Sequence, residues 1–528
     1  MMDHGTYRIA QQSTESRPAA LRLRLARIGS VRSLAIAAFF IGALVMLFHR
    51  PFSQGEVGDT AIYDYIAQSV LRGQVPYRDV VDIKWPAAAH LSALAMLVGK
   101  PLGIRDLIAV RLLNIFLVGS LSALIFLVTE TYLRSRTAAV IAFLVPLMLP
   151  RFADWMVAGT EPKLSLIVFG MLSLLLLARD QPFWAGLFSM LACLSWQPGL
   201  MFTGVTVLIF SRYLTSWRDM RAINAMIGAI IPLAVTVIYF ALRGALDDLW
   251  AWTITYNYGV FGPDANPGAM ASLEHIWKVT RKILQGDSVI VFLSVIGLFL
   301  FAAERILLKL RDKQSFRSPD LFRDAILIPP IIYFGFCLIN FQAGPDLIPF
   351  IPFIGIFAAK FSLDAGRLII SHLRKARPSI VGRAALIPQL AMGLLLALVL
   401  VRAASYRMQG PALRDQDKAF RRISDLLGPD GKIYVHGTTE ILVLLNKANM
   451  NPYVFLDWGA DGFAASRRGV EFSALIDEME SQAPKIVALS RMKVVSHRDD
   501  FEKWVDDKYE ELELEIPGYT GVYLRKQQ

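Results

Sequence analysis

Charged residues and cysteines are both scarce in this chain of 528 residues. Only 19% of the residues are charged, against about 25% in soluble proteins, whereas 55% are hydrophobic. The two cysteines, Cys193 and Cys337, lie in apolar runs, so neither a disulfide framework nor a cysteine metal site is predicted. No Asn-x-Ser/Thr sequon occurs, which favours a bacterial envelope over the secretory pathway of a eukaryote.

A net charge of +11 first suggests a polyanionic partner, but the distribution of that charge does not. Residues 415–528 carry 15 Lys or Arg against 20 Asp or Glu, and the rest of the chain carries 40 against 24. Most of that excess lies in short loops between apolar runs, where positive charge sets membrane orientation. The long apolar runs indicate a polytopic membrane protein and exclude soluble enzymes, disordered proteins and nucleic-acid binders.

Apolar runs of a length suited to crossing a bilayer recur along the first three quarters of the chain. We expect about eleven transmembrane helices, near residues 34–50, 107–131, 138–150, 162–179, 183–196, 199–211, 222–242, 288–308, 325–341, 346–363 and 384–402. Residues 86–98 are short for a span and are expected to form a helix at the outer membrane surface. With that assignment, Lys and Arg gather in alternate short loops, which places the N-terminus in the cytoplasm.

The charge pattern and the apolar runs divide the chain into three parts. Residues 1–33 form a basic cytoplasmic tail with an uncleaved signal anchor after it, and residues 34–405 form a transmembrane domain. This domain has two long outer loops, at 51–106 and 243–286. Residues 410–528 are expected to form a soluble α/β domain on the periplasmic side, because short apolar segments alternate there with helical patterns.

Two details refine the outer parts. The α/β domain is expected to have strands at 432–436, 453–456, 485–489, 512–516 and 521–524 and helices at 419–427, 440–446, 472–480 and 501–508. The loop 243–286 gathers four aromatic residues, which we interpret as anchors at the membrane interface rather than a sugar platform: Trp250, Trp252, Tyr256 and Tyr258.

Ionisable side chains are crowded in the first outer loop. Ile62, Ile66 and Val70 repeat at helical spacing, so residues 60–72 are expected to form an amphipathic helix on the outer leaflet. Asp59 directly precedes this helix, where its carboxylate could simply cap the first amides. Ionisable groups beside a bilayer are costly and are often functional, so the spacing leaves both interpretations of Asp59 open.

This loop resembles the first outer loop of the GT-C superfamily, the polyprenyl-phosphate-sugar-dependent glycosyltransferases. The similarity is greatest to the branch of protein O-mannosyltransferases and lipid A aminoarabinose and galacturonic acid transferases. Thr60 departs from the family pattern, which often has Glu at that position. The matching residues are Asp59, Ala67, Gly73, Pro76, Tyr77, Asp79, Lys84 and Pro86.

The resemblance implies a GT-C-like fold and an enzyme of the bacterial inner membrane. Such an enzyme would transfer a sugar from a polyprenyl-phosphate donor to a hydroxyl of an envelope acceptor, with inversion at the anomeric carbon. The acceptor would be lipid A, a polysaccharide, a glycolipid or a protein. Neither a cofactor nor a nucleic-acid partner is implied.

The resemblance also implies roles for single residues. Asp59 would be the general base that takes the proton of the acceptor hydroxyl. Lys84 would stabilise the donor phosphate, with Arg78 and Arg111 as further candidates. Glu161 would be a second catalytic carboxylate, although capping of the helix that follows, with Thr160 as the cap and Pro162 in the first turn, explains it equally well. The substrate-binding candidates are Tyr63, Tyr77, Asp79, Asp82 and Asp154.

No metal site is predicted, because His90 and His275 lie far apart without further ligands nearby. A divalent ion between Asp59 and Glu161 has no support from the spacing.

Two other functions fit part of the pattern. A transporter or flippase for a lipid-linked saccharide would explain the many spans, but no pair of matching halves is evident. An O-antigen polymerase or ligase would use a diphosphate donor.

Overall fold

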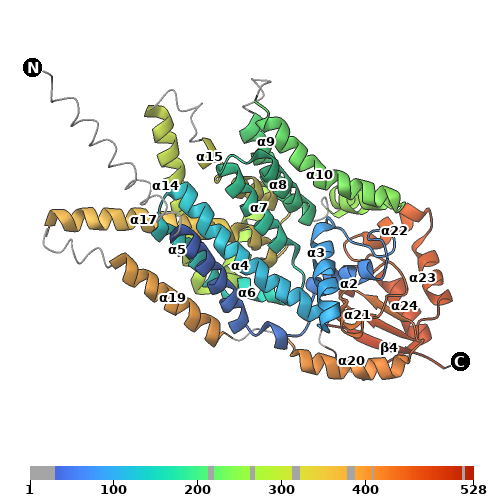
Figure 1. The fold of residues 1–528 in the computed structure, drawn as a ribbon. Coiled ribbons are helices and arrows are strands. Elements are labelled where there is room, and N and C mark those ends of the chain that lie inside the picture. Colours follow the sequence, from blue (N-terminus) through green and yellow to red (C-terminus); the bar gives the residue numbers. More distant parts are fainter. Residues whose placement is uncertain are drawn as a thin grey trace, which may run out of the picture.

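A computed structural model describes residues 30–211, 219–261, 268–311, 321–376, 387–406, 410–513, 516 and 518–527. Most of the predicted cytoplasmic tail lies outside these residues. In Figure 1 the long helices occupy one side of the molecule and the C-terminal part the other, with two helices of the first outer loop between them.

A first helix lies within Ser30–Ser53, and most of the following chain is helical. The α-helices of this part are α2 (Asp59–Leu71), α3 (Ala87–Gly99), α4 (Asp106–Leu133), α5 (Arg136–Leu147), α6 (Pro150–Val157), α7 (Pro162–Ala178), α8 (Pro182–Ser195), α9 (Leu200–Ser211), α10 (Arg221–Leu242), α11 (Leu246–Trp250), α13 (Ala269–Leu284), α14 (Ser288–Arg311), α15 (Leu321–Asp324), α16 (Ile328–Ile339), α17 (Ile351–Ala376) and α19 (Ile387–Ser405). A π-helix, η5, covers Ala251–Phe261, and a 3-10 helix, η8, covers Gly344–Phe350.

The chain is a multi-pass membrane protein. Among the described residues, six helices are long and apolar enough to cross a membrane, and α5 with α6, bent by 67°, would make a seventh span. This number is lower than the expected eleven, because four of the expected runs form apolar helices of only 10–17 residues: Pro162–Ala178, Pro182–Ser195, Gln197–Ser211 and Leu390–Ser405. A bilayer core of about 30 Å needs roughly 20 helical residues, so a short apolar run does not by itself define a span.

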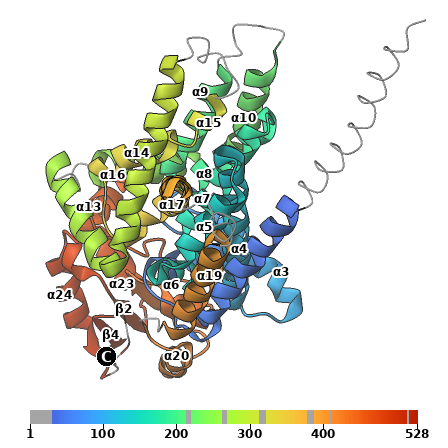
Figure 2. The ribbon, with the colours of Figure 1, turned by 90° about the vertical axis from the view of Figure 1, so that its left-hand side faces the viewer.

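Small residues let the long helices pack closely. Gly186 of α8 faces the backbone of α10, and Gly228 of α10 faces the backbone of α8, so an added Cβ at either position would collide with a carbonyl oxygen. Gly297 brings α14 against α17 in the same way. Such backbone contacts give helices in lipid the packing that a hydrophobic effect cannot supply there. Figure 2 shows α14 and α17 crossing in the centre of the bundle.

The C-terminal part is a mixed α/β region, as predicted. It contains α20 (Leu413–Leu427), β1 (Ile433–His436), α21 (Glu440–Leu445), α22 (Ala460–Arg468), α23 (Phe472–Ser481), β2 (Ile486–Leu489), α24 (Arg498–Lys508), β3 (Tyr509–Glu511) and β4 (Gly521–Arg525). The strand order is β1-β2-β4-β3, with β1 and β2 parallel and the other pairs antiparallel.

Two strand predictions differ from the structure. Residues 453–456 are buried but form no strand, because the hydrogen bonds that join them to the end of β1 do not form a ladder. The Gly437 amide donates to the Val454 carbonyl, and the Leu456 amide donates to His436 Nε2 at 3.0 Å. Of the strand expected at 512–516, residues 514 and 515 lie outside the described residues, and the strand that pairs with β4 in the described part is β3. Helix α22 was not expected.

Helix α2 forms where the sequence predicts it, but it does not lie on the outer leaflet. Its residues from Thr60 to Ser69 are buried, between α3 on one side and α21 of the C-terminal part on the other. The Asn449 amide donates a hydrogen bond to Tyr65 Oη at 2.7 Å, and Gln68 donates to the Val443 carbonyl at 3.2 Å. The amphipathic interpretation is wrong because both faces of the helix are covered by protein.

The four aromatic residues of the second outer loop divide into two pairs. Trp252 and Tyr256 are buried, and their rings lie 5.1 and 5.4 Å from the ring of Phe463 in α22. They anchor the loop to the C-terminal part rather than to a membrane interface. Trp250 and Tyr258 are exposed.

Candidate functional site

Asp59 is the first residue of α2, and its carboxylate does not cap the helix. Gly58 holds the N-cap position with a φ of 61°, a conformation that favours glycine. The Gly58 amide donates to Glu440 Oε1 at 2.8 Å. The Asp59 carboxylate accepts a hydrogen bond at 2.6 Å from Arg491, which follows β2 in the C-terminal part. The capping interpretation of Asp59 is therefore wrong.

The side chain of Asp59 is 57% exposed and faces a cavity of about 360 Å³. The cavity lies between the first outer loop, the start of α7 and the loop after β2. Glu161 and Asp154, both predicted from the sequence, line it, and so do Lys163 and Arg491, which were not predicted. Asp154 also accepts a hydrogen bond from Tyr406 at 2.6 Å.

Glu161 has a structural role and a place in the cavity at once. It is the N-cap of α7, and its carboxylate accepts a hydrogen bond from the Lys163 amide at 3.0 Å. The prediction that this helix is capped here is therefore confirmed, but the capping residue is Glu161 and not Thr160. Pro162 holds the first turn, as predicted. The Lys163 ammonium lies between two carboxylates, 3.7 Å from Glu161 and 3.6 Å from Asp346 of η8.

Two of the cations that act on Asp59, Lys84 and Lys163, approach the same tryptophan. Lys84 Nζ lies 4.5 Å from the ring centre of Tyr63 and 5.9 Å from that of Trp196, and Lys163 Nζ lies 4.7 Å from that of Trp196. Aromatic faces stabilise a cation without neutralising it. The rings therefore hold both ammonium groups, and Lys163 is in addition paired with Glu161 and Asp346.

The cations set the protonation state of Asp59. Burial among neighbouring atoms opposes its ionisation, but Arg491 and Lys84 outweigh this effect and lower the pKa of its carboxyl. Burial and the nearby Lys163 lower the pKa of Lys84. Asp82, which accepts hydrogen bonds from the amides of Ile83 and Lys84 at 2.7 and 3.1 Å, fixes the turn that carries Lys84. Asp59 is thus an ionised carboxylate on which three cations act, Arg491, Lys84 and Lys163.

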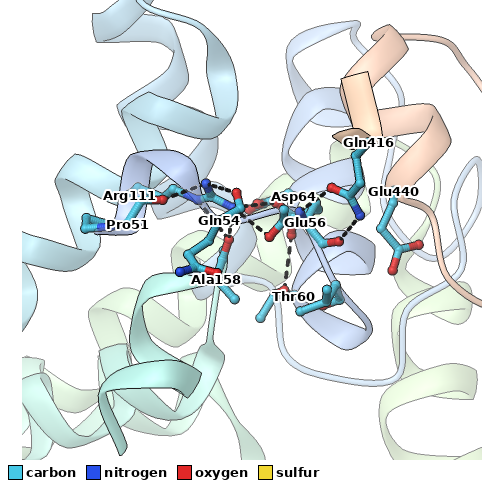
Figure 3. A network of polar contacts seen from close by, with 12 residues as sticks. Pro51, Gln54, Glu56, Thr60, Asp64, Arg111, Ala158, Gln416 and Glu440 are labelled. Atoms are coloured by element: carbon cyan, nitrogen blue, oxygen red, sulfur yellow. Dashed lines mark hydrogen bonds and ion pairs between the residues drawn. The ribbon is translucent and has the colours of Figure 1, made fainter. Parts of the chain in front are cut away.

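A second, fully buried network lies behind the cavity wall (Figure 3). Arg111 of α4 is 0% exposed and donates to the carbonyls of Pro51, Gln54, Gly55 and Ala158 at 2.6–3.0 Å. Its guanidinium also lies 3.7 Å from the carboxylate of Glu56. This arrangement pins the chain segment that leads into Asp59.

Two carboxyl groups share this buried network. Glu56 accepts from Thr60 at 3.1 Å, and Asp64 accepts from the Thr160 amide at 3.1 Å. One oxygen of each carboxyl has no hydrogen-bond partner among the described residues. Burial raises the pKa of Asp64 to about 7 and raises that of Glu56 as well. At least one of the two carboxyls is expected to hold a proton at neutral pH.

Other predicted site residues lie away from the cavity. Arg78 pairs with Asp79 at 2.8 Å on the surface, and Asp79 also accepts from the Val75 amide. Tyr77 is buried and donates to the Lys84 carbonyl at 2.7 Å, so it supports the lysine without facing the cavity. With Arg111 buried against carbonyls, only Lys84 of the three predicted phosphate-binding residues lies beside Asp59.

The sequence analysis missed Arg491 and Lys163. Lys163 stands two residues after Glu161, so its place on the same helix start was a usable signal. Arg491 had no signal, because 432 residues separate it from Asp59. Within the described ranges, no group of three or more His, Cys, Asp or Glu side chains could hold a metal ion. Three cationic side chains act on Asp59, those of Arg491, Lys84 and Lys163, and cations of this kind can bind an anionic group.

Comparison with known proteins identifies the fold but not a family. No family model matches the chain, and no curated protein matches it. Among solved structures, the crystal structure of the Archaeoglobus fulgidus oligosaccharyltransferase in complex with Zn and sulfate is similar, with a TM-score of 0.50 and 14% sequence identity. The match covers 92% of this chain and 73% of the other. The fold is GT-C-like.

Proposed function

We propose that this chain is a membrane glycosyltransferase that transfers a sugar from a polyprenyl-phosphate donor to a hydroxyl group of an envelope acceptor. The observation that carries the proposal is the ionised Asp59 carboxylate, which faces a cavity beside Arg491, Lys84 and Lys163. A GT-C-like fold agrees with this assignment.

Asp59 is suited to act as the general base. A hydroxyl is a poor nucleophile at neutral pH, and a positioned carboxylate accelerates its reaction by roughly 10²–10⁴-fold. The acceptor oxygen would bond to the anomeric carbon while its proton passes to Asp59. The bond from that carbon to the carrier phosphate breaks in the same step, so the sugar is inverted.

The leaving phosphate needs positive charge, and the two lysines supply it. Lys84 and Lys163 are held by the rings of Tyr63 and Trp196, and both act on Asp59. Cations fixed before the reaction stabilise the charge that develops on the leaving group. Arg491 orients the Asp59 carboxylate.

An apolar cavity offers room for the carrier chain. It measures about 400 Å³ and is lined by side chains of α13, α14, α16 and α17. Trp155 lines both this cavity and the one that contains Asp59, so the two adjoin. A prenyl chain in the apolar cavity would place its phosphate toward the lysines.

The test compares Asp59→Asn with Asp417→Asn in cells that lack the native gene. Asp417 also pairs with an arginine, Arg105 at 2.7 Å, but lies outside the cavity. At equal membrane levels, Asp59→Asn is expected to remove the sugar that the deletion removes from the envelope glycans, as seen by mass spectrometry, and Asp417→Asn to retain it.

Wild-type glycans in the Asp59→Asn strain would contradict the assignment of the base.

A second test uses the purified protein. We expect it to transfer the sugar from a synthetic polyprenyl monophosphate sugar but not from the diphosphate. Use of the diphosphate alone would point instead to a polymerase or ligase. Movement of the lipid across vesicles without any transfer would point to a flippase.

A further inference from the structure

A second cavity opens on the C-terminal part, on the far side of Arg491. It measures about 480 Å³, within the range of roughly 300–1,000 Å³ typical of small-molecule sites. Its walls come from the loops that follow β2 and the buried segment 453–456, and from α24. Arg491 lines both this cavity and the one that contains Asp59, so one side chain forms part of the wall of each.

The backbone at this cavity is strained in two places. Trp458 has a φ of 57° and Arg491 a φ of 58°, in the left-handed region that bulky side chains rarely adopt. Such a conformation costs free energy, and residues that adopt it cluster at functional sites. Both strained residues line the same cavity. Trp458 is also 50% exposed, whereas Trp504, the other tryptophan described in the C-terminal part, is buried.

The same cavity contains a buried carboxyl group. Asp457 is only 6% exposed, lines the cavity, and its carboxylate forms no hydrogen bond with another residue that the structure describes. Its carboxylate accepts a hydrogen bond from its own amide and is attracted by Arg491, but burial outweighs both and raises its pKa. The hydroxyl groups of a ligand could donate hydrogen bonds to a carboxylate in this position. The main-chain carbonyls of Asp457 and Trp458 accept hydrogen bonds from Tyr256 at 3.3 and 3.0 Å, so this loop is held firmly.

An exposed tryptophan, a buried carboxyl group and a guanidinium group line this cavity, and together they match the chemistry of a sugar. One face of a pyranose ring is lined by C–H groups and packs on an aromatic side chain, while its hydroxyls hydrogen-bond to carboxylates and guanidinium groups. We propose that the cavity formed by Trp458, Asp457 and Arg491 binds a saccharide and is the acceptor site of this protein. The ring of Trp458 would hold the acceptor sugar, and Asp457 would accept hydrogen bonds from its hydroxyls.

The proposal rests on the proposed function and gives it an acceptor class. A saccharide in this cavity would lie beside Arg491, whose guanidinium is 2.6 Å from Asp59. The acceptor hydroxyl could then reach Asp59 from the C-terminal side while the donor phosphate lies on the side of the lysines. Among lipid, protein and glycan acceptors, this geometry favours a glycan or the sugar part of a glycolipid.

The test is binding of the full-length protein, in lipid nanodiscs and without donor, to an array of neutral and uronate-containing oligosaccharides, followed by titration of the sugars that bind. Trp458→Ala is expected to weaken binding at least about tenfold, and Trp458→Phe, which keeps a ring, to weaken it less. Trp250→Ala is the matched control, because Trp250 is similarly exposed but lies outside the cavity, and it is expected to bind normally.

Asp457→Asn keeps the shape of the side chain and is expected to lose binding as well. Because this variant removes no large side chain, its loss of binding would not be explained by the folding defect that a tryptophan variant could have. Equal binding by wild type and Trp458→Ala, absence of any saccharide binding by wild type, or binding of a peptide library instead would overturn the proposal. Because binding is measured without donor, its result does not depend on whether Asp59→Asn abolishes transfer.

Discussion

Replacing Arg111 by methionine separates a structural role from a role in donor binding. The sequence analysis assigns Arg111 to the donor phosphate, whereas the structure buries it completely against four main-chain carbonyls and Glu56. Methionine keeps much of the side-chain volume but none of the hydrogen bonds. The variant therefore tests whether the segment before Asp59 depends on this guanidinium.

The expected cost follows from the contacts that are lost. Removing one partner of a buried ion pair costs about 3–5 kcal/mol, because the other charge stays buried without compensation. The orphaned carbonyls add to this, although water or protonation of Glu56 recovers part of it. We expect Arg111→Met to lower the free energy of unfolding by about 4 kcal/mol. Adding Glu56→Gln should restore part of that loss, since no buried charge then remains.

Denaturant titration of the purified protein in mixed micelles measures this change. Arg105→Met is the control, because Arg105 pairs with Asp417 at the surface and such pairs contribute about 0–1 kcal/mol. Limited proteolysis should also cut the segment before Asp59 faster in the Arg111→Met variant. Wild-type stability together with a raised KM for the donor would refute this reasoning and support phosphate binding.

Three further predictions concern the same region. Arg491→Gln removes a cation that lowers the pKa of Asp59, so the acid limb of the pH–rate profile should move to higher pH; an unmoved limb would argue against Asp59 as the base. Gly159→Ala places a Cβ 2.6 Å from two buried carboxylate oxygens and should destabilise the protein by about 1–3 kcal/mol in thermal unfolding, whereas Gly204→Ala, with open space around it, should not. The raised pKa of Asp64, about 7 in the folded chain, means that stability should fall as the pH rises from about 4 to about 7, and Asp64→Asn should flatten this dependence.

Local patterns in the sequence identify much of the fold. The apolar runs are sufficient to establish a multi-pass membrane protein, because lipid requires long stretches of apolar side chains. Alternating short apolar and helical patterns identify the α/β character of the C-terminal part. The same patterns overestimate the number of spans, since helices such as α8 and α9 are apolar but too short for a bilayer core.

Local sequence patterns predict only part of the candidate site. The spacing after Asp59 predicts helix α2, and Lys84 lies beside Asp59 in the structure. Helical periodicity could not reveal that both faces of α2 are covered, because the second cover comes from α21, far along the chain. An apolar stripe looks the same whether lipid or protein covers it.

The sequence alone is sufficient to identify the membrane class, the α/β nature of the last part and a loop rich in ionisable side chains. The partners of these side chains are visible only in the folded chain, where Arg491 lies beside Asp59 and Lys163 lies between Glu161 and Asp346. The folded chain also buries Arg111, which the sequence analysis assigned to the donor phosphate. Local spacing fixes which residues share a helix or strand, whereas charge pairing and burial depend on segments that are brought together only by folding.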